Sequence, residues 1–200
     1  MKVVFVCTAN VFRSVVAEGV CRKFLKEQEL DGITTVNSAG IGDSCGNQRP
    51  APILRVFLAE RGIDVAEHRS KCLTEETVGT AGLIIPMTRR QERKILTTFP
   101  SAEKKTYLLR RFDPLADHPD IKVTWEPVSE MMRKVYDEIY PAVLGLIEAI
   151  TSGEDPKARD WRFIFTDLAS YVTNASAAEA EIKLAELEAN ARQTTGLCMS

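Results

Sequence analysis

The sequence predicts an α/β fold, an open four-stranded parallel sheet with helices on both faces. Three observations support this prediction. Short apolar runs alternate with amphipathic segments of helical period over residues 1–150. The connections between them are short, as in repeated βα crossovers. A chain of 200 residues is long enough for one well-packed domain and too short for two ordinary ones.

The elements follow one another in βα order. The apolar runs predict strands over residues 2–6, 33–36, 83–85 and 105–109. Helical spacing predicts helices over residues 14–28, 51–61, 89–97 and 128–150. Val16, Val20 and Phe24 share one stripe of the first helix, Gly62 ends the second, and Pro86 indicates that the third strand ends early. Ligands of such sheets bind beyond the carboxyl ends of the strands.

The last fifty residues differ in composition from the domain over residues 1–150. Residues 151–156 read as a linker, and residues 161–172 are apolar enough to pack against another surface. Residues 175–192 predict a helix rich in alanine and glutamate with a thin apolar stripe. We therefore expect residues 151–200 to form a helical C-terminal extension that packs on its own domain or, alternatively, mediates a homodimer.

The loop after the first strand is the strongest functional signal. Cys7 ends the strand, and Arg13 stands six positions later at the predicted helix start. The backbone N–H groups of such a loop, joined by the first turn of the helix, bind phosphate-sized anions. Arg13 adds a planar fork of donors that matches two oxygens of a tetrahedral oxyanion. The loop residues expected to hold phosphate are Thr8, Ala9, Asn10, Val11 and Phe12.

The same electrostatic field favours a thiolate over a thiol at Cys7, which makes this residue the expected nucleophile. Ser14 could cap the helix or hydrogen-bond to the sulfur. Asn10 tolerates the left-handed backbone that a closed loop often needs. The alternative is that Cys7 is a packing residue at the end of a buried strand. The combination with Arg13 favours the functional interpretation.

Composition excludes several classes of function. The formal net charge is −2 without a long run of either sign, so we expect neither nucleic acid nor an anionic membrane as a partner. The sequence enters a strand directly and shows no signal peptide or spanning segment, so we expect a cytoplasmic protein. Five cysteines without metal-ligand spacing fit a reduced compartment better than a disulfide framework, and predict no metal and no cofactor.

Residues 1 to about 150 resemble the low-molecular-weight protein tyrosine phosphatase family, which includes related arsenate reductases and protein arginine phosphatases. Besides the Cys7 loop, the resemblance rests on segments 37–40, 62–65, 68–74 and 87–88. It implies that Cys7 attacks phosphorus, Arg13 clamps the phosphate and Ser14 steadies the thiolate. It also implies that Asn10, Ser38 and His68 hold the loop in shape through hydrogen bonds.

In this family a carboxylic acid on a distant loop protonates the leaving group, and the sequence leaves this residue open. Asp113 lies in a Phe112-Asp113-Pro114 run after the fourth predicted strand. Counting back from the long helix places residues 120–127 in the register of the catalytic loop, which would make Glu126 the acid. The sequence also leaves open whether either Asp113 or Glu126 is the general acid.

Three functions follow. The first is phosphomonoester hydrolysis through a cysteinyl-phosphate, on a phosphorylated protein, as expected for a tyrosine phosphatase, or a small phosphomonoester, with phosphate, vanadate or arsenate as anion ligands. The second is thiol-dependent arsenate reduction, although Cys72 more plausibly serves packing than redox exchange. The third is a degenerate, weakly active phosphate-binding protein. The segment after Gly40, where tyrosine phosphatases usually place an aromatic residue, reads Ile41-Gly42-Asp43-Ser44-Cys45, which puts recognition of phosphotyrosine in doubt.

Overall fold

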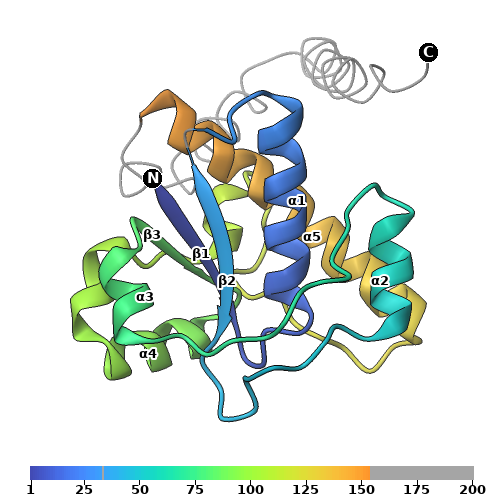
Figure 1. Ribbon diagram of the computed structural model, residues 1–200, viewed down its shortest axis with the longest axis horizontal. Coiled ribbons are helices and arrows are strands. Elements are labelled where there is room, and N and C mark those ends of the chain that lie inside the picture. Colours follow the sequence, from blue (N-terminus) through green and yellow to red (C-terminus); the bar gives the residue numbers. More distant parts are fainter. Residues whose placement is uncertain (33, 154–200) are drawn as a thin grey trace, which may run out of the picture. The chain divides into compact units, whose positions relative to one another are not determined.

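The sheet of the computed structural model, which describes residues 1–32 and 34–153, has three parallel strands in the order β2-β1-β3 (Figure 1). The strands are β1 (Lys2–Cys7), β2 (Thr35–Gly40) and β3 (Leu83–Pro86). In the register of β1 and β2, Cys7 lies opposite Gly40. Cys7 therefore stands at the carboxyl end of the central strand, where ligands of such sheets bind.

The described residues form five α-helices and two 3₁₀ helices. The α-helices are α1 (Arg13–Glu27), α2 (Pro52–Ala59), α3 (Glu75–Thr80), α4 (Arg89–Thr98) and α5 (Val128–Ser152). Two 3₁₀ helices, η1 (Pro100–Lys105) and η2 (Leu109–Phe112), connect α4 to the segment before α5. The four predicted helices are all present with small shifts at their ends. Helix α3 was not predicted, although Thr74 caps it by accepting from the Thr77 N–H at 3.2 Å.

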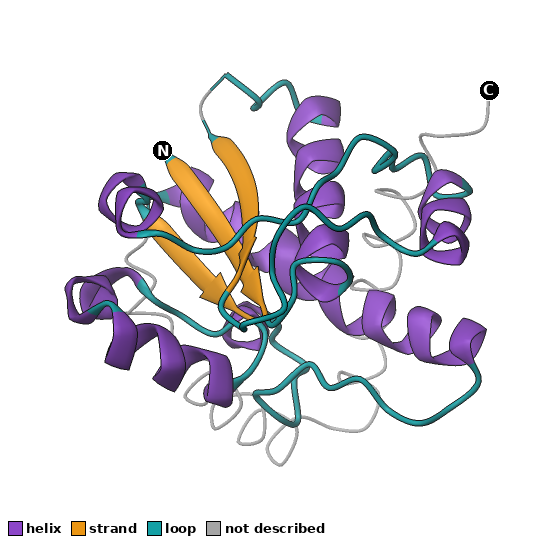
Figure 2. Cartoon of the chain, turned by 60° about the horizontal axis from the view of Figure 1, so that its bottom comes forward, coloured by secondary structure: helices purple, strands orange, loops and turns teal. Residues whose placement is uncertain are grey.

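Both faces of the sheet are covered, as predicted (Figure 2). Alternate residues of β1 point to opposite faces. Val3 and Phe5 belong to the core shared with α1 and α5, whereas Val4 and Val6 belong to a second core shared with α3 and α4. Burial on both sides explains why β1 is a continuous apolar run.

The prediction of a fourth strand over residues 105–109 is wrong. Only Thr106 pairs with the sheet, through an isolated parallel bridge to Ile84. Helix η1 ends at Lys105 and helix η2 begins at Leu109. Three residues remain between these helices, too few for a strand of ordinary length.

Helix α5 continues to Ser152 and ends at Gly153, whose φ is 69°. The left-handed conformation suits glycine at a helix C-terminus. The linker predicted from residue 151 therefore begins inside the last turn of α5. The rest of the expected C-terminal extension lies outside the described residues. None of the helices over residues 1–32 and 34–153 has the length and apolarity needed to cross a membrane.

Candidate active site

The loop Thr8–Phe12 turns back on itself between β1 and α1. Asn10 has a φ of 57°, so the left-handed conformation predicted for this residue is confirmed. Its backbone N–H points to the Cys7 Sγ atom at 3.3 Å. The carbonyl of Phe12 accepts the first helical hydrogen bonds, from Val15 and Val16, both at 2.9 Å. Arg13 is consequently fixed as the first residue of the helix.

Several backbone donors of the loop remain available to a ligand. Within the described part of the chain, the N–H groups of Ala9, Val11 and Phe12 have no protein acceptor. A closed loop of unpaired N–H groups ahead of a helix N-terminus is an anion site. This arrangement supports the phosphate loop that the sequence predicts.

Cys7 is buried at the edge of the apolar core, and its sulfur contacts polar groups of the loop and of α1. The Ser14 Oγ atom is 3.0 Å from this sulfur, and the Asn10 Nδ2 atom donates to the same hydroxyl at 3.0 Å. Because the hydroxyl oxygen accepts from Asn10, its own hydrogen is free to point at the sulfur. Two donors, the Ser14 hydroxyl and the Asn10 N–H, can therefore point at the Cys7 sulfur.

Asn10 is the centre of the network that holds the loop. Its buried side chain also donates to the Ser38 Oγ atom at 2.7 Å and accepts from the Lys71 N–H at 3.0 Å. The Ser38 hydroxyl in turn donates a hydrogen bond to the Glu18 carboxylate. The His68 Nε2 atom lies 3.0 Å from the Asn10 carbonyl, which can only accept, so this nitrogen carries the proton. The Asn10 amide consequently starts two chains of hydrogen bonds, one through Ser38 to Glu18 and one through Ser14 to Cys7.

Arg13 faces the anion site and is held by the far side of the cleft. Its Nη1 atom donates to the Ile121 carbonyl at 2.9 Å. Burial lowers the pKa of Arg13, while the nearby Cys7 and Asp120 favour its charged form. An arginine keeps its charge under such conditions. Arg13 therefore presents a fixed positive charge beside Cys7.

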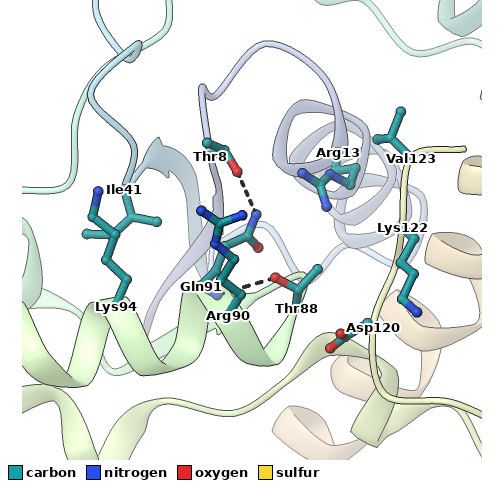
Figure 3. A pocket seen from close by; sticks show the side chains of 10 residues that line it. All are labelled: Thr8, Arg13, Ile41, Thr88, Arg90, Gln91, Lys94, Asp120, Lys122 and Val123. Carbon is teal, nitrogen blue, oxygen red and sulfur yellow. Dashed lines mark hydrogen bonds between the residues drawn. The ribbon is translucent and has the colours of Figure 1, made fainter.

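A cavity of about 450 Å³ opens beside this loop (Figure 3). Figure 3 shows Arg13 and Asp120 on one side and Ile41 and Lys94 on the other. The cavity is lined by Thr8, Arg13, Ile41, Thr88, Arg90, Gln91, Lys94, Asp120, Lys122 and Val123. Gln91, which the sequence did not indicate, donates to the Thr8 hydroxyl at 3.1 Å. No aromatic side chain is among these lining residues.

Asp120 is the carboxylate that the structure brings to the site, and the sequence interpretation missed it. Its Oδ1 atom accepts from the Arg89 N–H at 2.7 Å. The next residue, Ile121, donates its N–H to the Met87 carbonyl at 2.8 Å and accepts from Arg13. These contacts hold Asp120 against the cavity.

Neither predicted candidate for the general acid lines this cavity. Asp113 is buried, accepts from the Leu115 N–H at 2.9 Å and lies 3.4 Å from Arg110. Glu126 pairs with Lys134 at 2.7 Å, and this hydrogen bond is the main cause that lowers the pKa of Glu126. A carboxyl group that must donate a proton needs the opposite shift.

The expectation of reduced cysteines rather than a disulfide framework is wrong for Cys45 and Cys72, which are joined, with a Cα–Cα distance of 5.2 Å. Their segments meet through backbone hydrogen bonds between Asn47 and Ser70 at 2.7 Å and between Ser70 and Gln48 at 2.9 Å. The proximity of Cys45 and Cys72 depends on this tertiary pairing. The same segments contact the phosphate loop, since the Gly42 N–H donates to the Thr8 carbonyl at 2.8 Å.

Reduction of the disulfide is expected to lower the free energy of unfolding by about 3 kcal/mol, because the bond restricts a loop of moderate length in the unfolded chain. Thermal unfolding with and without a thiol reductant measures this effect. A Cys45→Ser/Cys72→Ser variant should unfold at the same midpoint as the reduced protein, and the reductant should not change this midpoint. An unaltered midpoint on reduction of the parent chain would contradict the stabilising role.

Comparisons with known proteins agree with the geometry. The family model of low molecular weight phosphotyrosine protein phosphatase matches residues 2–155. A protein-arginine-phosphatase of Geobacillus stearothermophilus is 31% identical over 149 residues, covering 74% of this chain and 95% of the relative. A probable low molecular weight protein-tyrosine-phosphatase, EpsP, of Ralstonia solanacearum is 31% identical over 147 residues, covering 72% of this chain and 97% of the relative.

Solved structures show the same fold. The YwlE arginine phosphatase from Geobacillus stearothermophilus superposes with a TM-score of 0.65 at 29% identity, covering 76% of this chain and 94% of that structure. A protein tyrosine phosphatase from Entamoeba histolytica has a TM-score of 0.70 at 21% identity, covering 76% of this chain and 98% of that structure. From the family match, the sequence relatives and the shared fold, we conclude that the chain belongs to the low molecular weight phosphotyrosine protein phosphatase family.

Proposed function

We propose that this chain hydrolyses phosphomonoesters of protein side chains through a cysteinyl-phosphate on Cys7. The observation that carries the proposal is the juxtaposition of Cys7, the unpaired loop N–H groups and Arg13 at the end of the central strand. Phosphoryl transfer depends on positioning and on stabilisation of charge on the transferring group. The loop amides and Arg13 supply that stabilisation.

The first step forms the Cys7 S–P bond as the P–O bond to the leaving group breaks. Asp120, in its protonated form, gives its proton to the departing oxygen, because it lines the cavity with Arg13. In the second step the Asp120 carboxylate takes a proton from water. The water oxygen attacks phosphorus, the S–P bond breaks, and inorganic phosphate and the Cys7 thiolate are released.

Phosphotyrosine fits this cavity better than phosphoarginine. The lining side chains carry four cations, Arg13, Arg90, Lys94 and Lys122, against the single carboxylate of Asp120. A guanidinium leaving group would be repelled by this excess of positive charge. Ile41 and Val123 offer an apolar surface to a ring, although no aromatic wall is present among the lining residues.

Arsenate reduction is less well supported. The structure pairs Cys72 with Cys45, so Cys72 is not the free thiol that would exchange with Cys7. The other free cysteine of the described residues, Cys21, is buried, and burial raises its pKa to about 12. A thiol of this kind is a poor nucleophile at neutral pH.

The test is hydrolysis of p-nitrophenyl phosphate and of a phosphotyrosine peptide by the purified chain in the presence of a metal chelator. We expect turnover of both substrates and competitive inhibition by vanadate and phosphate. Binding of vanadate without any turnover would instead support the degenerate, binding-only alternative.

A further inference from the structure

The mouth of the cavity carries more positive charge than the binding of one phosphate group requires. Besides Arg13, the lining residues include Arg90, Lys94 and Lys122. Figure 3 shows that Arg90 and Lys94 come from α4, whereas Lys122 lies on the opposite side, beyond Asp120. Cations from two separate elements therefore flank the phosphate site.

Stability of the fold does not account for these charges. Arg90 stands in the first turn of α4, where the helix dipole disfavours a cation. In the described ranges, neither Arg90 nor Lys122 forms an ion pair or a side-chain hydrogen bond. Lys94 lies 3.4 Å from Asp43, whose side chain is fully exposed. Such a surface pair contributes little, so all three cations remain available to a ligand.

We propose that Arg90, Lys94 and Lys122 form a subsite for further anionic groups of the substrate; this inference rests on the proposed function. The subsite selects phosphorylated peptides with Asp or Glu next to the phosphoresidue. The loop N–H groups and Arg13 hold the scissile phosphate, which leaves the cations at the mouth for other groups. An extended peptide carries side chains on both sides of its phosphoresidue. This matches cations placed on opposite sides of the cavity.

The surface beside the cavity also suits a polypeptide. Val123 lines the cavity, and Trp125, two residues further along the same segment, is fully exposed. Exposed aromatic residues are enriched where proteins bind other chains. The expected selectivity is about threefold for each exposed carboxylate–cation pair, and about tenfold or more for the set. Lys94 should contribute least, because a peptide carboxylate must compete with Asp43.

The experiment compares two matched phosphotyrosine peptides, one with Glu and one with Gln on each side of the phosphotyrosine. The readout is the ratio of their kcat/KM values, which cancels effects common to both peptides. We expect the unaltered chain to prefer the acidic peptide by about tenfold at low ionic strength, and less in high salt, where exposed charges are screened. In the Arg90→Gln/Lys94→Gln/Lys122→Gln variant the ratio should fall to near one.

Arg93→Gln is the matched control. Arg93 is exposed on the same helix and carries the same charge, but it does not line the cavity. This variant should keep the preference for the acidic peptide. A ratio near one in the unaltered chain, or an equal fall of the ratio in Arg93→Gln, would overturn the subsite. Failure of the unaltered chain to hydrolyse p-nitrophenyl phosphate would instead count against the proposed phosphatase activity.

Discussion

Replacing Cys7 with serine is expected to lower kcat for phosphate esters by at least about four orders of magnitude, as loss of a catalytic nucleophile does. The hydroxyl is a much weaker nucleophile than a thiolate at neutral pH. The loop N–H groups and Arg13 stay in place, so the variant should still bind phosphate. Binding should be as tight or tighter, because a serine hydroxyl is neutral and does not repel the dianion as the proposed thiolate would. Steady-state kinetics and calorimetry measure the two effects.

Cys21→Ala is the control for this variant. Cys21 is the second free cysteine of the described residues and is buried in α1, away from the polar loop contacts of Cys7. Its loss should cost stability through the small cavity it leaves and should not lower kcat. Activity that survives in Cys7→Ser, or that disappears in Cys21→Ala while the protein stays folded, would contradict the assignment of the nucleophile.

Asp120→Asn is expected to lower kcat/KM for a phosphotyrosine peptide by about two to four orders of magnitude, the usual contribution of a positioned proton donor. An amide cannot protonate the departing oxygen. The loss in kcat/KM should be much smaller for p-nitrophenyl phosphate, whose leaving group departs well without a proton. The dependence of kcat/KM on leaving-group basicity measures this difference directly.

The two carboxylates predicted from the sequence are the controls for Asp120. Glu126→Gln should leave the leaving-group dependence as it is, because Glu126 pairs with Lys134 and does not line the cavity. Asp113→Asn removes one of the two carboxylate partners of buried Arg110, which keeps Asp117, and should lower stability by about 2 kcal/mol, again without changing that dependence. A steeper dependence in either variant, with Asp120→Asn unaffected, would assign the proton donor elsewhere.

The strand–loop–helix unit that we propose to bind phosphate could be predicted from the sequence because its parts are contiguous. Cys7, Asn10 and Arg13 lie within one strand–loop–helix unit, where local geometry alone decides which groups face the anion. The order of strands and helices could also be predicted, since the apolar runs and stripes of each element are local.

Asp120, the proposed general acid, could not be predicted, because its place depends on contacts between distant segments. Asp120 is held by the Arg89 N–H, while Ile121 is held by Met87 and Arg13. Counting back from the long helix points to residues 120–127, and within that range it favours Glu126 over Asp120.

The disulfide and the number of strands were missed for the same reason. Cys45 and Cys72 are 27 residues apart and meet only after their two segments pair. The apolar run over residues 105–109 resembles a strand, but flanking 3₁₀ helices leave only Thr106 to pair with the sheet. Tertiary context overrides local preference in both cases.

The most direct test of the central claim, that Cys7 carries the phosphoryl group, is to trap the intermediate. Asp120→Asn mixed with p-nitrophenyl phosphate should form the intermediate readily and hydrolyse it slowly, because activation of water also requires the Asp120 carboxylate. Rapid denaturation followed by mass spectrometry should find one phosphoryl group on the peptide that contains Cys7. Turnover of the substrate with no phosphoryl group on the protein, or with the group on another residue, would contradict the claim.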